Sequence, residues 1–229
     1  MDDLKYKKLI RKLKLKNYEE SYFLESTSER KRNKFVLDMF KGVDKNAKIL
    51  NVGDGTGTIS LELEKIGFRN IVAIDINKEF LAIAKKRCKY TKFIYANAHN
   101  LPFDDNKFDI ITYVDVIEFL DFEMAIKEAY RVTNSSGIVY FENFNKLILT
   151  YLKKIPLLEL FVESSKRYKT QTNFNAIKLM KQSNFKIKKF EYLIADSKKS
   201  MKRTFFKLIM RNIFLRKILS PVSYFYLEK

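Results

Sequence analysis

Residues 49–57 read ILNVGDGTG, a short apolar run that leads into glycines at alternate positions. The apolar run is typical of a buried strand, and the glycines permit tight, positive-φ turns that let a ligand approach the backbone closely. The spacing differs from the G-x-G-x-x-G dinucleotide pattern and from the G-x-x-x-x-G-K-[ST] phosphate loop. The stretch therefore predicts a strand and a ligand-binding turn, and it argues against NAD and ATP as the ligand.

On either side of this stretch, apolar segments of strand length alternate with helical segments. Strands this apolar, separated by helices, indicate a mostly parallel sheet with helices on both faces, which is the doubly wound α/β class. The further strands are expected at residues 70–74, 93–95, 108–114, 137–142, 185–195 and 222–227. The helices are expected at residues 4–15, 28–40, 59–66, 78–88, 122–132, 174–182 and 197–219.

The chain is basic, but unevenly so. Its 229 residues include 45 Lys and Arg against 27 Asp and Glu, for a formal net charge of +18, and 46% of them are hydrophobic. That apolar content excludes a fully disordered chain. Residues 47–145 are close to neutral, whereas the basic excess is concentrated in residues 146–229. Such segregation favours a phosphate-bearing partner for the basic part, either nucleic acid or anionic lipid.

The cysteine content and the N-terminal sequence bear on the compartment. Cys88 is the one cysteine, so no internal disulfide is expected. No signal segment opens the sequence, and no uncharged stretch approaches the ~20 residues that a membrane-spanning helix needs. We therefore expect a cytoplasmic protein.

A carboxylate, Asp75, follows the second expected strand. At the tip of that strand it is placed to accept hydrogen bonds from both hydroxyls of a ribose lying across the edge of the sheet. An Asp after an apolar strand is also a common helix cap, and Asp75 or Asn77 could cap the helix that begins at Lys78. With the glycine turn upstream, we favour ribose binding for Asp75.

Two further motifs complete a recognisable order. Residues 97–103, NAHNLPF, put amide and backbone groups at the tip of the third strand, and residues 108–120, FDIITYVDVIEFL, supply the fourth strand and its exit loop. In this order, the motifs resemble those of the class I S-adenosylmethionine-dependent methyltransferases over residues 47–142. The resemblance implies a seven-stranded Rossmann-like sheet, S-adenosyl-L-methionine as the cofactor, and methyl transfer to an acceptor.

The resemblance also assigns cofactor contacts: the glycine turn at the methionine end, Asp75 at the ribose, and residues 97–99 at the adenine. This chain departs from the family at Asn51 and Asn97, where the family usually has acidic residues, and an amide brings no charge to the positive end of the cofactor. The expected cofactor-binding residues are Asn51, Gly53, Asp54, Gly55, Gly57, Asp75, Ile76, Asn97, Ala98, His99 and Asp115.

The exit loop at residues 115–120 indicates the chemistry of the acceptor. It is similar to the corresponding loop of the ubiquinone-biosynthesis O-methyltransferases, in which two acidic residues precede a histidine and the trio is linked to a divalent ion. Phe119 stands in place of that histidine, so no metal site is expected. The resemblance makes Asp115 and Glu118 the expected catalytic residues and oxygen the expected acceptor atom.

Residues 146–170 and 197–219 mix apolar and basic side chains, and the latter is expected to form a basic amphipathic helix. Such segments suit an anionic membrane surface and a small or lipid-linked acceptor, although packing against the sheet would explain the helix as well. The alternatives are an RNA methyltransferase, because the cations could follow a phosphate backbone, and a non-catalytic cofactor-binding or scaffold protein of the same fold.

We expect a single methyltransferase domain over residues 1–229, cytoplasmic and peripheral to the membrane. No internal repeat or low-complexity linker interrupts it. Its expected parts are N-terminal helices at 1–46, a cofactor-binding core at 47–145, an insertion over the acceptor site at 146–170, and a C-terminal half at 171–229.

Overall fold

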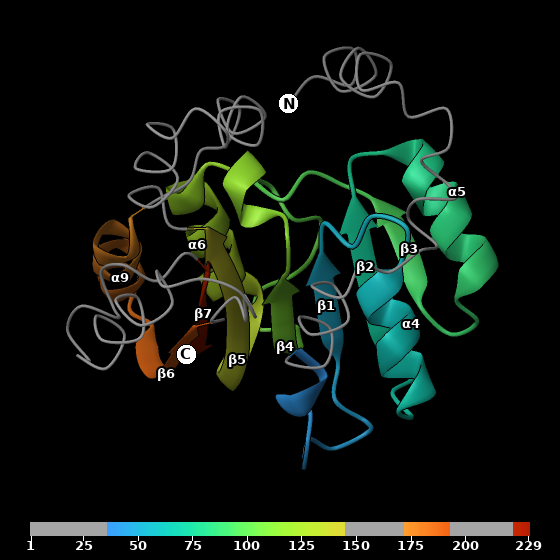
Figure 1. Cartoon of the computed structure of the whole chain (residues 1–229), viewed down its shortest axis with the longest axis horizontal. Coiled ribbons are helices and arrows are strands. Elements are labelled where there is room, and N and C mark those ends of the chain that lie inside the picture. The colour runs from blue at the N-terminus through green and yellow to red at the C-terminus, as the bar shows by residue number, and fades with distance from the viewer. Residues whose placement is uncertain (1–35, 145–171, 193–221) are drawn as a thin grey trace, which may run out of the picture.

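In the computed structural model, residues 36–144, 172–192 and 222–229 are described, and they form a seven-stranded sheet (Figure 1). The strands are β1 (Ile49–Val52), β2 (Ile71–Asp75), β3 (Lys92–Tyr95), β4 (Phe108–Tyr113), β5 (Thr133–Phe144), β6 (Lys186–Tyr192) and β7 (Val222–Glu228). The helices are α4 (Thr58–Lys65), α5 (Lys78–Arg87), α6 (Phe122–Val132) and α9 (Asn173–Gln182), with the 3₁₀ helix η1 (Ile117–Phe119) after β4.

The strand order is β3-β2-β1-β4-β5-β7-β6. β1 pairs in parallel with β2 and β4, and the parallel pairing continues outward to β3 and β5. β7 lies antiparallel between β5 and β6. This arrangement confirms the predicted doubly wound, mostly parallel sheet. Because the chain proceeds from β1 to β2 on one side and later to β4 on the other, a ligand position opens at the carboxyl ends of these strands.

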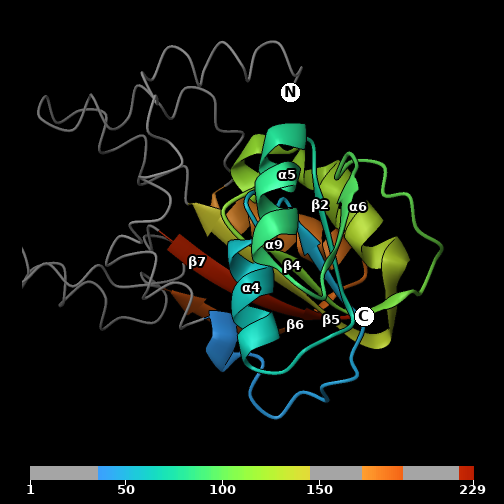
Figure 2. The ribbon, with the colours of Figure 1, turned by 90° about the vertical axis from the view of Figure 1, so that its right-hand side faces the viewer.

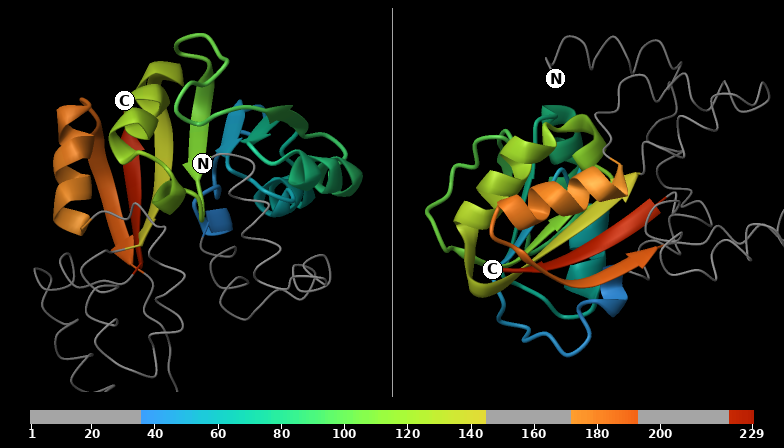
Figure 3. Two further views of the ribbon diagram at one scale, coloured as in Figure 1. Left: turned by 90° about the horizontal axis from the view of Figure 1, so that it is seen from above. Right: turned by 90° about the vertical axis from the view of Figure 1, so that its left-hand side faces the viewer.

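Helices cover both faces of the sheet, as Figures 2 and 3 show. Successive residues of a strand point to opposite faces. Leu50 and Ile74 pack in the hydrophobic cluster that includes α6 and α9, whereas Ile49 and Ile71 pack in the cluster that includes α4 and Phe40. Burial on both faces explains why β1 and β2 are almost continuously apolar.

The strand β5 is longer than the predicted 137–142. It spans Thr133–Phe144: Thr133 pairs with Phe108 of β4 at its start, and β7, distant in the sequence, pairs with Ile138–Phe144 along its second half. The predicted insertion at 146–170 and the predicted helices at 4–15 and 197–219 lie outside the described residues. Within the described ranges, no helix is both long and apolar enough to cross a membrane.

A buried carboxylate anchors the loop between α5 and β3. Glu64, on α4, accepts hydrogen bonds from the backbone N–H groups of Lys89, Tyr90 and Thr91 at 2.8–2.9 Å and from the Thr91 hydroxyl at 2.7 Å. Burial by itself would raise the pKa of Glu64, but these donors outweigh it and hold the pKa below its ordinary value. The contact fixes the end of α5 against α4, below the glycine turn.

This anchor predicts an effect on stability. Glu64→Gln should lower the free energy of unfolding at pH 7 by about 1–3 kcal/mol, since an amide cannot satisfy the same set of donors. Glu62→Gln, which loses only the surface contact with Lys65 on the same helix, should change it by less than about 0.5 kcal/mol. Denaturant unfolding measures both.

The pH dependence follows from the lowered pKa. The stabilisation by Glu64 is present above the pKa of the unfolded chain and is lost as the pH falls through the lower, folded-state value. The difference in stability between the wild type and Glu64→Gln should therefore shrink in acid. Equal stabilities of the two Gln variants at pH 7 would contradict the assignment.

Candidate functional site

The glycine turn follows β1 at the carboxyl edge of the sheet. Gly53, Gly55 and Gly57 have φ values of 71°, 55° and 80°, in the left-handed region. A Cβ added at Gly53 would lie 2.2 Å from a methyl group of Val116, and one added at Gly57 would lie 3.0 Å from the Cβ of Ala84. Backbone conformation and close packing therefore both require glycine at these two positions, so the turn presents its backbone to the edge of the sheet.

Asp75, at the end of β2, joins this turn to α5. Its Oδ2 accepts from the N–H of Gly55 at 3.0 Å, and its Oδ1 accepts from the N–H of Asn77 at 2.8 Å. Burial raises the pKa of Asp75, and backbone hydrogen bonds from Asn77, Gly55 and Ile76 oppose that rise. A carboxylate has about four acceptor positions, so Asp75 can still accept from a ligand.

The sequence left open whether Asp75 or Asn77 caps α5, and the structure shows that Asn77 does. Asn77 caps α5, because its side chain accepts from the N–H of Phe80 at 2.9 Å. Asp75 is thereby left at the strand tip, with Ile76 beside it. The Ile76 side chain is 37% exposed, which offers an apolar surface next to the carboxylate. This pairing fits a nucleoside, with hydroxyls at the carboxylate and a flat base on the apolar side chain.

Asn51 lies beneath the turn. It is 1% exposed; its Oδ1 accepts from the Thr112 hydroxyl at 2.7 Å, and its Nδ2 donates to the Ser60 hydroxyl at 2.8 Å. Both side-chain groups thus face protein, linking β1 to β4 and α4. The sequence placed Asn51 among the cofactor-binding residues, whereas the structure gives it partners below the turn.

Asp54 shares a hydrogen-bonding partner, the Ser60 hydroxyl, with Asn51. The Ser60 hydroxyl donates to its Oδ2 at 2.5 Å, and the N–H of Ile59 donates to its Oδ1 at 3.2 Å. Burial, with a smaller contribution from the charge of Asp75, raises the pKa of Asp54 to about 7. The Ser60 hydroxyl therefore links the neutral amide of Asn51 to the carboxyl group of Asp54.

The loop after β3 carries the predicted residues Asn97, Ala98 and His99. Asn97 is exposed and its Oδ1 accepts from the N–H of His99 at 3.0 Å, which closes a tight turn. The Nε2 of His99 accepts from the N–H of Asp121, at the start of α6, at 2.8 Å. Because this nitrogen is an acceptor, it carries no proton, and His99 ties the loop to α6.

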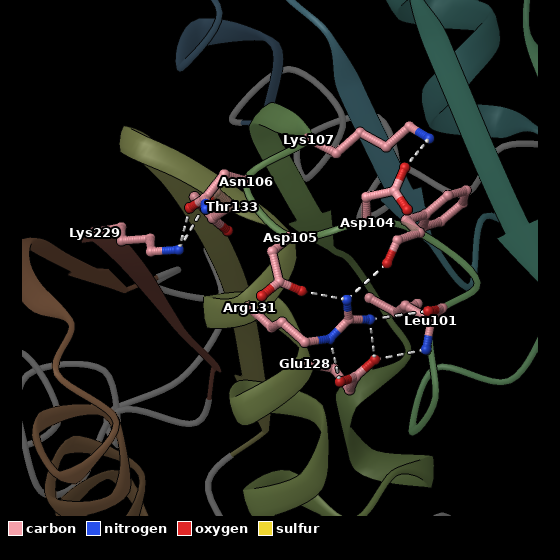
Figure 4. Close-up of polar contacts among 10 residues, drawn as sticks. Leu101, Asp104, Asp105, Asn106, Lys107, Glu128, Arg131, Thr133 and Lys229 are labelled. Atoms are coloured by element: carbon pink, nitrogen blue, oxygen red, sulfur yellow. Dashed lines mark hydrogen bonds and ion pairs between the residues drawn. The ribbon is translucent and has the colours of Figure 1, made fainter.

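A guanidinium clamps the far end of this loop (Figure 4). Arg131, on α6, donates to both carboxylate oxygens of Glu128 at 2.8 Å and to Asp105 at 2.9 Å. It also donates to the carbonyls of Phe103 at 2.7 Å and Leu101 at 2.9 Å. All five donors of the side chain are used, so the loop is fixed to α6.

Further acidic side chains lie at the ends of β4 and β5. Asp115 is exposed, with φ 57°, and its N–H donates to Oε2 of Glu142 at 2.9 Å. The Tyr224 hydroxyl donates to Oε1 of the same carboxylate at 3.0 Å. Glu118, on η1, is 4% exposed. The structure thus places both predicted catalytic residues after β4, and it adds Glu142 on the neighbouring strand.

Glu142 was missed by the sequence analysis. The signal was an acidic residue at the end of the apolar strand predicted at 137–142, where buried polar groups are uncommon. Its contacts with Asp115 and Tyr224 become visible only in the folded chain. Among the described residues, no group of three or more His, Cys, Asp or Glu side chains is arranged to hold a metal ion.

Comparison with known proteins agrees with this geometry. Residues 50–141 match a family model described as a methyltransferase domain. The ubiquinone/menaquinone biosynthesis C-methyltransferase of Rickettsia typhi is 36% identical over 128 residues, which make up 51% of this chain and 50% of that protein. The chain spans about half the length of the curated relatives it matches.

Solved structures share the fold. An S-adenosylmethionine-dependent methyltransferase of Methanosarcina mazei aligns with a TM-score of 0.60 and 19% identity over 83% of this chain and 96% of that one. The geranyl diphosphate C-methyltransferase of Streptomyces coelicolor, solved with S-adenosyl-L-homocysteine, aligns with a TM-score of 0.64 and 10% identity over 87% and 80% of the two chains. At these identities the likeness concerns the fold alone.

The fold is the one shared by class I S-adenosylmethionine-dependent methyltransferases, and residues 50–141 within it match a methyltransferase domain. Within that class, residues 50–141 are a methyltransferase domain whose sequence is similar to C-methyltransferases of ubiquinone and menaquinone biosynthesis. S-adenosyl-L-methionine is the cofactor of the class. These findings confirm the predicted fold, class and cofactor.

The Arg131 clamp predicts a local loss of order. Arg131→Lys keeps the charge but cannot make the five hydrogen bonds, so it should lower the free energy of unfolding by about 1–2 kcal/mol. Hydrogen exchange of the backbone amides at residues 97–107 should become faster. Lys127→Gln, which removes a surface pair with Glu123 on the same helix, should leave that exchange unchanged. Unaltered exchange at 97–107 in Arg131→Lys would contradict the clamp.

Proposed function

We propose that this chain transfers a methyl group from S-adenosyl-L-methionine to a small or lipid-linked acceptor that carries a hydroxylated, quinol-type ring. The observation that carries the proposal is the adjacency of the glycine turn and Asp75 at the ends of two paired parallel strands, within a methyltransferase domain. The glycine turn, the Asp75 carboxylate and the apolar Ile76 side chain lie next to one another, so different parts of a single nucleoside-containing ligand could contact all three.

The described residues fit the cofactor by their chemistry. The backbone of the glycine turn would hold its methionine end, and the spare lone pairs of Asp75 would accept the two ribose hydroxyls. Ile76 and the loop at Asn97 and Ala98 would flank the adenine. When bound, the cofactor supplies an electrophilic methyl group on a positively charged sulfur.

The residues after β4 and β5 supply the acid–base chemistry in this proposal. The acceptor would gain the methyl group at a ring carbon or an oxygen and lose a proton, while the electron pair of the broken carbon–sulfur bond would remain with the cofactor. Asp115 or Glu118 would take that proton, whereas Glu142 would act as a positioning residue through the N–H of Asp115. The buried Tyr224 hydroxyl would hold Glu142 in place.

The proposal also covers which atom of the acceptor is methylated and whether the protein attaches to a membrane. The names of the relatives describe C-methylation, which favours carbon over the oxygen that the sequence predicts. The basic and apolar patterns of residues 146–170 and 197–219 support peripheral attachment to an anionic membrane from the cytoplasmic side. The same cations would serve an RNA methyltransferase, so the test includes RNA.

The test is transfer of a labelled methyl group. The full chain is incubated with S-adenosyl-L-methionine labelled at the methyl group and with demethylated quinols, total RNA or protein extract. Label is expected in the quinol fraction, and mass spectrometry of the product distinguishes a ring C-methyl from an O-methyl group. Label in RNA alone would overturn the acceptor proposal. Binding of the cofactor without transfer to any fraction would favour the non-catalytic alternative.

The carboxylate on β5 predicts a kinetic effect. Glu142→Gln should lower kcat about tenfold or more, because an amide has one acceptor oxygen and cannot accept from both the N–H of Asp115 and the Tyr224 hydroxyl as the carboxylate does. The Kd for S-adenosyl-L-methionine should change less than about twofold, since Glu142 lies on the acceptor side. Steady-state kinetics and calorimetry measure the two quantities. Equal losses in kcat and in cofactor affinity would contradict this division of roles.

A further inference from the structure

The connection between β4 and α6, residues 114–121, carries both side chains proposed to take the proton of the acceptor, Asp115 and Glu118. Its η1 helix is bonded internally, since the N–H of Leu120 donates to the carbonyl of Ile117 at 3.1 Å. Such bonds shape the connection locally. Contacts with neighbouring elements attach it to the rest of the molecule.

Two of these contacts lead to the elements proposed to bind the cofactor. At one end of the connection, Val116 packs on the glycine turn so closely that a Cβ added at Gly53 would lie 2.2 Å from one of its methyl groups. At the other end, the N–H of Asp121 donates to Nε2 of His99 at 2.8 Å. The connection therefore touches both the turn proposed for the methionine end and the loop proposed for the adenine.

The loop that carries His99 has a defined backbone. The N–H of His99 donates to Oδ1 of Asn97 at 3.0 Å, and the N–H of Asn100 donates to the Asn97 carbonyl at 3.1 Å. On the other side of the contact, the side chain of Asp121 caps α6 by accepting from the N–H of Met124 at 3.1 Å. The imidazole thus joins a tight turn in the loop to the first residue of a helix.

The helix itself does not require this histidine. The N–H of an N-cap residue lies outside the hydrogen-bond ladder of its helix, and Asp121 is the N-cap of α6. At its partly exposed position, water could satisfy this N–H equally well. The bond to His99 instead takes its acceptor from the loop after β3, which links two segments on different sides of the sheet edge.

We propose that His99 is a positioning residue that couples occupancy of the cofactor site to the connection bearing Asp115 and Glu118. The inference deepens the proposed function and rests on it. A bound adenine orders the loop at Asn97, and the bond between His99 and Asp121 transmits that order to the connection. The cofactor thereby holds the proposed proton-accepting groups in place before the acceptor arrives.

The size of the effect follows from linkage. When the Asp121 N–H exchanges by opening of the loop, a ligand that binds only the closed loop slows that exchange by the factor 1 + [L]/Kd. The limit is about 100-fold at a ligand concentration of about 100 times Kd, and we expect at least about tenfold at Asp121.

Two substitutions separate the acceptor atom from the rest of the side chain. His99→Phe keeps a flat ring but has no acceptor, so its Asp121 amide should exchange fast and slow less than about twofold with ligand. His99→Gln supplies a neutral acceptor oxygen at a similar reach, so it should restore most of the slowing. Asn100→Ala, at an exposed position in the same loop, is the matched control and should behave as the wild type.

Hydrogen exchange of the full chain, resolved at single amides by NMR, tests the proposal with and without S-adenosyl-L-homocysteine. Each protein receives the ligand at about 100 times its own Kd, measured by calorimetry, so that a change in affinity does not distort the comparison. The Asp115 amide, which is bonded to Glu142 rather than to the loop, reports whether the connection stays folded in each variant.

No slowing at Asp121 in the wild type, or the same ligand-dependent slowing in His99→Phe, would overturn the inference. The second result would mean that the histidine is purely structural. If His99→Phe unfolds the connection, with fast exchange at Asp115 as well, the wild type and His99→Gln decide: slowing at Asp121 in both supports the inference, and slowing confined to residues 97–100 overturns it. Failure of the wild type to bind S-adenosyl-L-homocysteine at millimolar concentration is a different result, because it would overturn the proposed function itself.

Discussion

One carboxylate, Asp75, bridges two turns at the carboxyl edge of the sheet. Asp75 accepts from Gly55 across the β1–β2 pair and from Asn77 at the start of α5, so the exits of two parallel strands are fixed to each other. The bridge adds to the backbone hydrogen bonds from Gly53 and Asp54 to the carbonyl of Ile74, which hold the glycine-rich turn against β2. Because the donors are backbone groups, the bridge holds the main chain itself and leaves lone pairs for a ligand. The edge is therefore organised before a ligand arrives, which lowers the entropic cost of binding.

The two sides of the edge are held together by different kinds of contact. At the ends of β1 and β2, Asp54 bonds to the start of α4 and Asp75 to the neighbouring turns. At the ends of β4 and β5, Glu142 joins Asp115, which follows β4, to Tyr224 on β7, far along the chain. The contacts of Glu142 therefore require the sheet to include its antiparallel strand. The contacts of Asp54 and Asp75 require mainly β1, β2 and the two helices that follow them.

This difference explains what could be predicted from the sequence. The glycine turn and the place of Asp75 at a strand tip follow from local patterns, because each rests on short-range geometry, whereas the seven-stranded class was implied by the resemblance of the ordered motifs. Local patterns could not show that Asn51 accepts a hydrogen bond from Thr112, because Thr112 lies on a different strand. Neither Glu142 nor Arg131 stood out, because each is an ordinary residue type whose role comes from partners brought together by folding. The division of Asn77 and Asp75 into cap and strand-tip acceptor likewise needed coordinates.

The packing beneath the glycine turn also affects how the protein can be studied. Cys88 is the one cysteine of the chain; it is buried against Gly57, and its thiol stays protonated at neutral pH. Only a thiolate reacts readily with maleimides and related reagents. The native protein should therefore resist such labelling, and a cysteine introduced at an exposed position such as Phe174 could carry a fluorophore or spin label selectively. Distances between such a label and a bound ligand could then be followed without first removing the natural thiol.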